Sequence, residues 1–195
     1  MTEKQALDRV EIRLAGEGGQ GMILAGIILA EAAAIYDGKY AIQTQSYGPE
    51  ARGGASKAEV VIAQGEIDYP EVIFADALVA MSQEAYDKYA PNVKKTGYLI
   101  IDDEKVVRAL SPNVVRVPIT RLAVDTTKKA ITANVVALGV LVGLTGVVSH
   151  QAIEKAVTAR APKGTEEMNR AALSAGFDAA EKVLSAKPAG KRNHH

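Results

Sequence analysis

The chain has 195 residues, enough for one domain of ordinary size with a substantial hydrophobic core. Its 23 Lys and Arg balance its 23 Asp and Glu, so no net charge attracts nucleic acid or an anionic membrane surface. Without cysteine, the chain offers no disulfide, no catalytic thiol and no thiolate ligand for zinc or an iron–sulfur cluster. We therefore expect any redox chemistry to lie in another chain.

The two ends of the sequence are polar. The amino-terminal segment carries charges and lacks the apolar core of a signal peptide, so a cytoplasmic location is expected. Residues 1–186 are expected to form a single Rossmann-like domain. Residues 187–195 are polar and basic, which predicts a flexible tail.

The first recognisable feature is a glycine-rich segment between a strand and a helix. Residues 10–15 alternate apolar with polar side chains, which predicts a strand, and residues 22–34 carry one charge and no proline, which predicts a mostly buried helix. Between them, Gly16, Gly18 and Gly21 have the G-x-G-x-x-G spacing. Such glycines let the backbone turn sharply and approach a ligand, while the free N–H groups of the helix start face an anion.

A standard dinucleotide site is not expected at this segment. In such sites an acidic residue at the end of the second strand holds a ribose hydroxyl, but the second predicted strand, residues 40–45, ends without one. The segment is therefore interpreted as a structural turn or a loop that faces a partner.

The remaining pattern alternates strands with helices. After a loop at residues 46–54, strands are expected over residues 56–63, 77–81, 97–102 and 113–118, with helices over 83–89, around 105–110, over 150–158 and over 166–184. Ser82 is positioned to cap the first of these helices. The alternation predicts an α/β fold: an open, mostly parallel Rossmann-like sheet flanked by helices, with a helical C-terminal third.

An uncharged segment, residues 131–148, approaches the length of about 20 residues that spans a bilayer. Burial within the protein is the preferred interpretation, because a parallel sheet needs helices on both faces. Gly139, Gly143 and Gly146 predict a bare helix face that another helix can approach closely. We expect no membrane span. The apolar surface of this helix also predicts self-association of the isolated chain, or burial by partners.

The candidate site lies where the two special loops meet. Ligands of open α/β sheets gather at the carboxyl ends of strands, and both loops follow strands there. If the first two strands are neighbours, the loops form one edge. The candidate binding residues are Gly16, Gly18, Gly19, Gln20, Gly21, Tyr47, Arg52, Gly53 and Gly54.

Arg52 has a planar cationic fork suited to phosphate or carboxylate, although an internal ion pair with Glu50 or another nearby acid is an equal alternative. No catalytic pair of carboxylates, serine–histidine arrangement or metal-ligand cluster accompanies the loops. No catalytic or metal-binding residue is therefore assigned to this chain.

The loop sequences resemble a known family. Residues 18–21 (GGQG), 25–32 (AGIILAEA), 43–56 (QTQSYGPEARGGAS), 68–70 (DYP) and 169–172 (NRAA) are similar to the gamma subunit of 2-oxoacid:ferredoxin oxidoreductases. The resemblance covers nearly the whole chain. Residues 50–54 (EARGG) resemble the 2-oxoglutarate enzymes more than the pyruvate enzymes.

The resemblance implies a non-catalytic gamma subunit of a larger cytoplasmic complex. Such a complex decarboxylates a 2-oxoacid on thiamine diphosphate with Mg²⁺, passes two electrons through iron–sulfur clusters to ferredoxin, and releases an acyl-CoA, here succinyl-CoA. These cofactors belong to the companion alpha, beta and ferredoxin-like delta subunits, and CoA is a co-substrate. The isolated chain is expected to show no activity. The alternatives are an indolepyruvate or pyruvate oxidoreductase subunit, or a stand-alone CoA- or nucleotide-binding Rossmann module.

Overall fold

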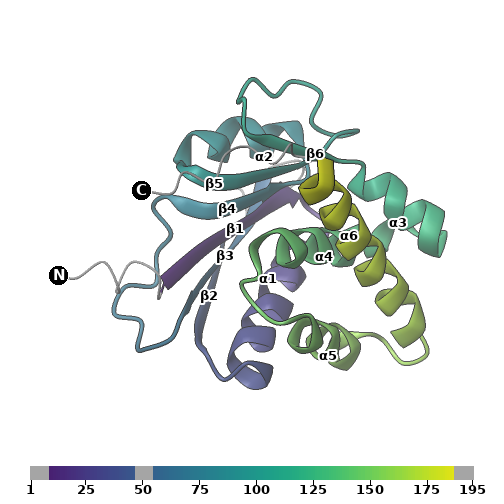
Figure 1. The fold of residues 1–195 in the computed structure, drawn as a ribbon, viewed down its shortest axis with the longest axis horizontal. Coiled ribbons are helices and arrows are strands. Elements are labelled where there is room, and N and C mark those ends of the chain that lie inside the picture. The colour runs from purple at the N-terminus through teal and green to yellow at the C-terminus, as the bar shows by residue number, and fades with distance from the viewer. Residues whose placement is uncertain (1–8, 47–54, 187–195) are drawn as a thin grey trace.

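The computed structural model describes residues 9–46 and 55–186 (Figure 1). The candidates Tyr47, Arg52, Gly53 and Gly54, and the tail 187–195, lie outside the described residues. Along the chain the elements are β1 (Arg9–Glu17), α1 (Met22–Glu31), the π-helical turn η2 (Ala32–Tyr36), β2 (Tyr40–Ser46), β3 (Ala55–Ala63), β4 (Ala75–Ala80), α2 (Gln83–Tyr89), the short helical turn η3 (Ala90–Asn92), β5 (Val93–Asp102), β6 (Val114–Val117), α3 (Ile119–Thr127), the short helical turn η4 (Ala130–Thr132), α4 (Ala133–Thr145), α5 (His150–Arg160) and α6 (Glu166–Ala186).

The described strands form one sheet in the order β2-β3-β1-β4-β5-β6 (Figure 1). The neighbours from β1 through β4 and β5 to β6 run parallel, whereas β3 runs antiparallel to both β1 and β2. The predicted α/β fold is confirmed, with a sheet that is mixed on the β2 side. β3 reverses direction because residues 47–54 are too few for the crossover that a parallel neighbour needs.

The two special loops do not follow neighbouring strands, because β3 lies between β1 and β2. Since β3 is antiparallel to both, β1 and β2 run in the same direction. Glu17 pairs with Ala55, and Ser46 pairs with Lys57 two residues further along β3. The carboxyl ends of β1 and β2 therefore still reach the same edge of the sheet.

Alternating side chains of the central strands divide the core into two parts. Ile12 and Leu14 of β1 face the larger hydrophobic cluster, which α1 and α4 cover. Ala15 and Leu78 face the opposite side, where they pack with Tyr86 of α2. Figure 1 shows α2 on one side of the sheet, with α1 and the C-terminal helices on the other.

The uncharged segment forms α4, which α6 covers inside the chain. Every residue of α4 except Gly143 and Thr145 is buried. A Cβ atom on Gly139 would lie 2.9 Å from the Cα of Gly176, and one on Gly143 would lie 2.6 Å from the Cβ of Ala180. The predicted close helix approach is thus observed, and α4 offers no surplus surface for self-association.

Gly146 does not belong to that helix face. It ends α4 in the left-handed conformation, with φ of 60°, and a Cβ on it would have no neighbour within 4 Å. Its role is conformational, because few residues other than glycine adopt this backbone geometry easily. Among the described helices, none is both long and apolar enough to cross a membrane.

The predicted helix around residues 105–110 is wrong. The backbone there bonds to side chains of α2: Gln83 Nε2 donates to Arg108 O at 2.8 Å, and Arg108 N donates to Gln83 Oε1 at 2.9 Å. The hydroxyl of Tyr86 accepts from Leu110 N at 3.1 Å. Because α2 supplies these partners, the segment needs no hydrogen bonds of its own and remains irregular.

Candidate functional site

The glycine segment after β1 is held in place by the side chain of Gln20. Gln20 Oε1 accepts from Glu17 N at 2.7 Å, and Gln20 Nε2 donates to Met81 O at 2.9 Å. Met81 N in turn donates to Ala15 O at 2.9 Å, so β1 and the end of β4 are joined twice. The predicted site residue Gln20 therefore uses both ends of its amide within the chain, which indicates a positioning role.

The glycines of this segment serve two different purposes. Gly21 precedes α1 with φ of 75°, and a Cβ on it would lie 2.7 Å from Asn134 Nδ2. A Cβ added to Gly16 would lie 3.1 Å from the Cβ of Met81. Gly18 and Gly19 are exposed, and a Cβ on either would meet nothing within 4 Å. Gly16 and Gly21 are thus required by packing. Gly18 and Gly19 leave the backbone open to a ligand or a partner.

A hollow of about 340 Å³ lies beside this open backbone, beyond the ends of the parallel strands. It is lined by Gly19, Gln20, Met81, Lys105, Thr120, Ala130, Ile131 and Ala133. Lys105 is exposed and is the cation of this lining. Ligand sites of open α/β sheets occupy this position, and a cation suits a phosphate or a carboxylate.

Lys105 was not among the candidates predicted from the sequence. Lys105 follows the carboxylates at the end of β5. Because this segment was wrongly predicted as a helix, the sequence did not indicate that Lys105 lies at the carboxyl ends of the strands. Lys105 N donates to Asp102 O at 3.1 Å, which turns the chain toward the hollow. The general rule that loops after parallel strands bear ligands applies to it as it does to the glycine segment.

The fully buried carboxylate of Asp102 organises this part of the edge. Asp102 Oδ2 accepts from Thr120 N at 3.0 Å and from the Thr120 hydroxyl, and Asp102 Oδ1 accepts from Glu104 N at 3.2 Å. These bonds fix the start of α3 against the end of β5. Burial, with the negative charges of Asp102 and Glu104, raises the pKa of the neighbouring Asp103 above its ordinary value.

The start of β3, which follows the second predicted loop in the chain, lies beside the glycine segment. Ser56 Oγ donates to Gly16 O at 3.2 Å, and Ala55 N donates to Glu84 Oε1 at 3.2 Å. The start of β3 is therefore tied both to the glycine segment and to α2. Residues 47–54, with Tyr47, Arg52, Gly53 and Gly54, lie outside the described residues.

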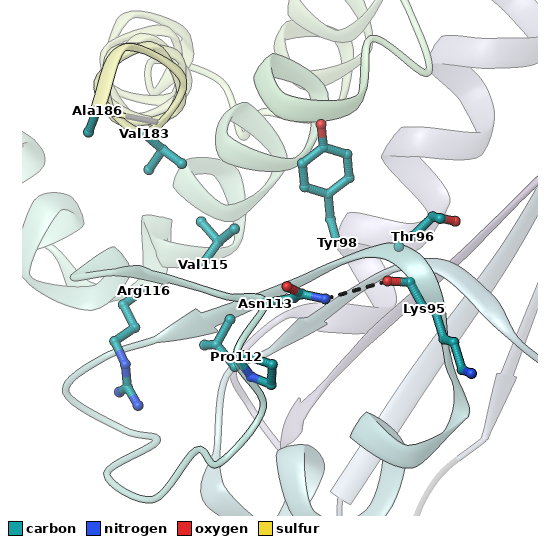
Figure 2. A pocket seen from close by; sticks show the side chains of 11 residues that line it. Lys95, Thr96, Tyr98, Pro112, Asn113, Val115, Arg116, Val183 and Ala186 are labelled. Atoms are coloured by element: carbon teal, nitrogen blue, oxygen red, sulfur yellow. Dashed lines mark hydrogen bonds between the residues drawn. The ribbon is translucent and has the colours of Figure 1, made fainter. Parts of the chain in front are cut away.

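Two other features do not form a reactive site. His150 begins α5 behind its cap Ser149 and stacks on the ring of Phe177, with 4.0 Å between ring centroids. A hollow of about 680 Å³ near the start of β5 and β6 is shown in Figure 2, where Val183 and Ala186 of α6 overlie it and Asn113 bonds to Lys95. It lies at the opposite end of these strands from the glycine segment. Within residues 9–46 and 55–186, no group of three His, Cys, Asp or Glu could hold a metal ion.

The family to which the chain belongs follows from the extent of a sequence match. The family described as pyruvate ferredoxin/flavodoxin oxidoreductase matches residues 11–179, from β1 into α6. The chain belongs to this family.

Relatives within the pyruvate ferredoxin/flavodoxin oxidoreductase family cover the chain almost completely. The 2-oxoglutarate synthase subunit KorC of Methanocaldococcus jannaschii is 50% identical, over 94% of this chain and 100% of the relative. The solved gamma subunit of a keto/oxoacid ferredoxin oxidoreductase from Geobacter sulfurreducens is also 50% identical, with a TM-score of 0.80 over 89% of this chain and 99% of that one.

A more distant structure shares the fold. The 2-oxoglutarate:ferredoxin oxidoreductase of Magnetococcus marinus, solved with 2-oxoglutarate, coenzyme A and succinyl-CoA bound, is 22% identical with a TM-score of 0.80. The match covers 93% of this chain and 32% of that one. The expected resemblance to oxidoreductase gamma subunits is confirmed, and the stand-alone Rossmann module is disfavoured. The chain is a subunit of an oxidoreductase complex.

Proposed function

We propose that this chain is the gamma-type subunit of a 2-oxoglutarate:ferredoxin oxidoreductase. The observation that carries the proposal is the 50% identity to a 2-oxoglutarate synthase subunit over the whole length of that relative. The loop sequence EARGG at residues 50–54 supports the same substrate. A cytoplasmic location is part of this proposal.

The complex would convert 2-oxoglutarate and CoA into succinyl-CoA and CO2, with two electrons passed to ferredoxin. Thiamine diphosphate with Mg²⁺, when bound in a companion subunit, supplies the electron sink for decarboxylation. The companion alpha, beta and ferredoxin-like delta subunits would hold this cofactor and the iron–sulfur clusters. The lack of cysteine here supports that division, because clusters are held mainly by cysteine thiolates.

This chain would contribute the edge formed by its two loops. Gly18 and Gly19 present open backbone, and Lys105 places a positive charge at the adjoining hollow. Gly16, Gln20 and Gly21 hold that backbone in position, as do the bonds of Asp102 on the other side of the hollow. We propose that Tyr47, Arg52, Gly53 and Gly54 complete the edge, with Arg52 engaging CoA phosphates or an acidic residue of a companion subunit.

Co-expression with candidate companion subunits tests the proposal. The purified complex is assayed with 2-oxoglutarate, pyruvate, a branched-chain 2-oxoacid and indolepyruvate, each with CoA and ferredoxin. We expect the largest kcat/KM for 2-oxoglutarate, and no turnover by the isolated chain. A complex that prefers another 2-oxoacid would overturn the substrate assignment, and turnover by the isolated chain would overturn the non-catalytic role.

A further inference from the structure

A small apolar hollow lies among α1, α4, α5 and α6, which Figure 1 shows on one side of the sheet. Its volume is about 260 Å³. Small-molecule sites typically measure roughly 300–1,000 Å³, so this hollow suits one bulky apolar side chain better than a free ligand. Its apolar wall is formed by Leu24, Ile28, Ile131, Val135, Val157 and Met168.

Two apolar side chains of this wall are open to water. Ile131 of η4 is 75% exposed, and Leu24 of α1 is 41% exposed. Single exposed apolar residues are common on protein surfaces, but these two border the same hollow. A partner that filled the hollow would therefore remove contiguous apolar surface from water.

The segment that carries Ile131 is fixed by hydrogen bonds. Thr132 Oγ1 donates to Lys129 O at 2.9 Å, and Lys129 N donates to Thr127 Oγ1 at 3.2 Å. Lys128 has φ of 61°, which is the only positive φ of a non-glycine residue within the described ranges. Such a conformation persists where the surrounding structure enforces it. Ile131 can therefore be bound with little further loss of chain freedom.

The hollow also holds an unused hydrogen-bond acceptor. Asn134 lines the hollow and is 5% exposed. Its Nδ2 donates to Gly21 O at 3.4 Å, whereas its Oδ1 accepts no hydrogen bond from any described residue. Because buried polar groups are normally paired, this oxygen suits an occupant that brings an N–H or O–H donor with its apolar side chain.

The charged residues of the lining give the hollow a positive rim. They are Lys129 and Arg160. Arg160 forms an ion pair with Glu31, whereas Lys129 has no ion-pair partner among the described residues. The occupant is therefore expected to place neutral or acidic groups beside its apolar side chain.

The position of Ile131 decides which occupant fits. Ile131 also lines the hollow of about 340 Å³ beside the glycine segment, at the edge where the proposed function places this chain's contribution to the active site. The reactive group belongs to a companion subunit, so that subunit must come close to this edge and to Ile131. A second copy of this chain would bring no thiamine diphosphate and would close the edge to the companion. In the Magnetococcus protein the same fold makes up 32% of a longer chain, so there it is joined to further residues of the enzyme.

We propose that the apolar hollow receives a bulky apolar side chain of the companion subunit that binds thiamine diphosphate, with Leu24 and Ile131 packed around it. This inference rests on the proposed function. Apolar side chains inserted into fitted pockets carry much of the binding energy of protein interfaces. The inserted side chain would hold the companion's cofactor close to the glycine segment.

Binding of this chain to the immobilised complex of the alpha, beta and delta subunits tests the proposal. Leu24→Asp places a charge at the rim of the apolar hollow, and it should raise the dissociation constant at least tenfold. At saturating concentration, kcat and KM for CoA should stay within twofold of their values for the unsubstituted chain, because Leu24 does not line the hollow beside the glycine segment. Ile73→Asp, at a 57% exposed position before β4, is the matched control and should bind normally.

A variant that fills the hollow separates insertion from general apolar attraction. Ala161 lines the hollow, so the ring of Ala161→Phe would occupy part of it. This variant should also raise the dissociation constant at least tenfold, although its surface is more apolar. Hydrogen exchange of the unsubstituted chain does not depend on any variant folding. Amides of residues 130–132 should exchange more slowly when the companion subunits are added, and not when the concentration of the isolated chain is raised.

Four outcomes would overturn the proposal. The first two are binding of Leu24→Asp, or of Ala161→Phe, as tight as that of the unsubstituted chain. The third is normal binding of Leu24→Asp with a raised KM for CoA, which would assign the hollow to a small molecule. The fourth is a dimer of the isolated chain, seen by sedimentation velocity, that Leu24→Asp dissociates, which would assign it to a second copy. The binding measurement needs no substrate, so a complex that prefers another 2-oxoacid would overturn the substrate assignment alone.

Discussion

The side-chain amide of Gln20 donates a 2.9 Å hydrogen bond to the backbone carbonyl of Met81, which ties the glycine segment after β1 to the end of β4. The same side chain accepts from Glu17 N. One residue thus fixes the loop after β1 against the end of the parallel strand β4, at the edge where ligands of this fold class bind. The predicted binding residue is better described as the support of the open backbone at Gly18 and Gly19.

Gln20→Ala is expected to lower the free energy of unfolding by about 1–2 kcal/mol, because two hydrogen bonds are lost and water replaces them in part. Urea denaturation followed by circular dichroism measures the change. Gln151→Ala, at an exposed position of α5, is the matched control and should change stability by less than about 0.5 kcal/mol. Equal stability of the two variants would contradict the supporting role of Gln20.

Arg52→Ala is expected to leave the fold intact, with a change in unfolding free energy within about 1 kcal/mol, since a loop charge contributes little. In the assembled complex it should raise KM for CoA or weaken assembly. Steady-state kinetics and gel filtration of the complex check these outcomes. Arg108→Ala is the control, because Arg108 is an exposed arginine whose backbone alone bonds to α2. Normal assembly with unchanged CoA and 2-oxoacid kinetics would favour the ion pair with Glu50.

Lys105→Ala is expected to raise KM for CoA by about two- to fivefold, which corresponds to an exposed charge contact of about 0.5–1 kcal/mol. The reason is that Lys105 is the cation lining the hollow beside the glycine segment. Raising the salt concentration should reduce the difference from the unsubstituted complex. Lys163→Ala, at an exposed position before α6, is the control. An effect of Lys105→Ala no larger than that of the control would exclude a CoA role for this hollow.

Gly176→Ala is expected to destabilise the chain by about 1–3 kcal/mol, because the added methyl group would lie 2.8 Å from Gly139 Cα and 2.9 Å from Val140 N. On an open helix surface the same change would stabilise by about 1 kcal/mol, so the sign itself is diagnostic. Thermal unfolding measures it. Gly65→Ala, where a methyl group meets nothing within 4 Å, should be nearly neutral. A stabilised Gly176→Ala chain would mean that α4 and α6 lie further apart than described.

Asp37→Asn is expected to reduce stability by about 1 kcal/mol at neutral pH, an effect that shrinks as the pH falls below about 3.9 and is lost below the lowered folded-state pKa. Burial opposes ionisation of Asp37, but hydrogen bonds from Ser149 N and Oγ, both 2.7 Å, and the charge of Lys39 outweigh it, so its pKa is lowered. A lowered folded-state pKa adds stability above the unfolded pKa of about 3.9, and this stability is lost as pH falls through the folded pKa.

Urea titrations of Asp37→Asn and of the unsubstituted chain at a series of pH values from 7 down to about 2 measure this difference. Asp87→Asn on α2 is the control, since Asp87 bonds to a side chain of its own helix only. A difference between the variant and the unsubstituted chain that stays the same across the whole pH series would contradict the contribution of the Asp37 charge.

The local elements and the family could be predicted from the sequence, because both depend on short-range patterns of residues. Alternation in residues 10–15, the glycine spacing and the cap at Ser82 predicted β1, the loop and α2; the loop sequences identified the family before any contact was known. Ser82 does cap α2, accepting from Ala85 N at 3.2 Å. These features depend on residues a few positions apart, because helix and strand geometry impose a fixed periodicity on neighbouring side chains.

Which residues meet across long separations in the chain depends on how the whole chain packs. In the folded chain β3 lies between β1 and β2, and Gln20 bonds to Met81. Lys105 lines the hollow, and α4 is buried beneath α6. Residues 105–110 were mispredicted for the same reason, since their hydrogen-bond partners lie on α2, about 25 positions away along the chain. Such pairings follow from packing of the whole chain, and no local pattern of apolar and polar residues encodes which distant partner will satisfy a given backbone group.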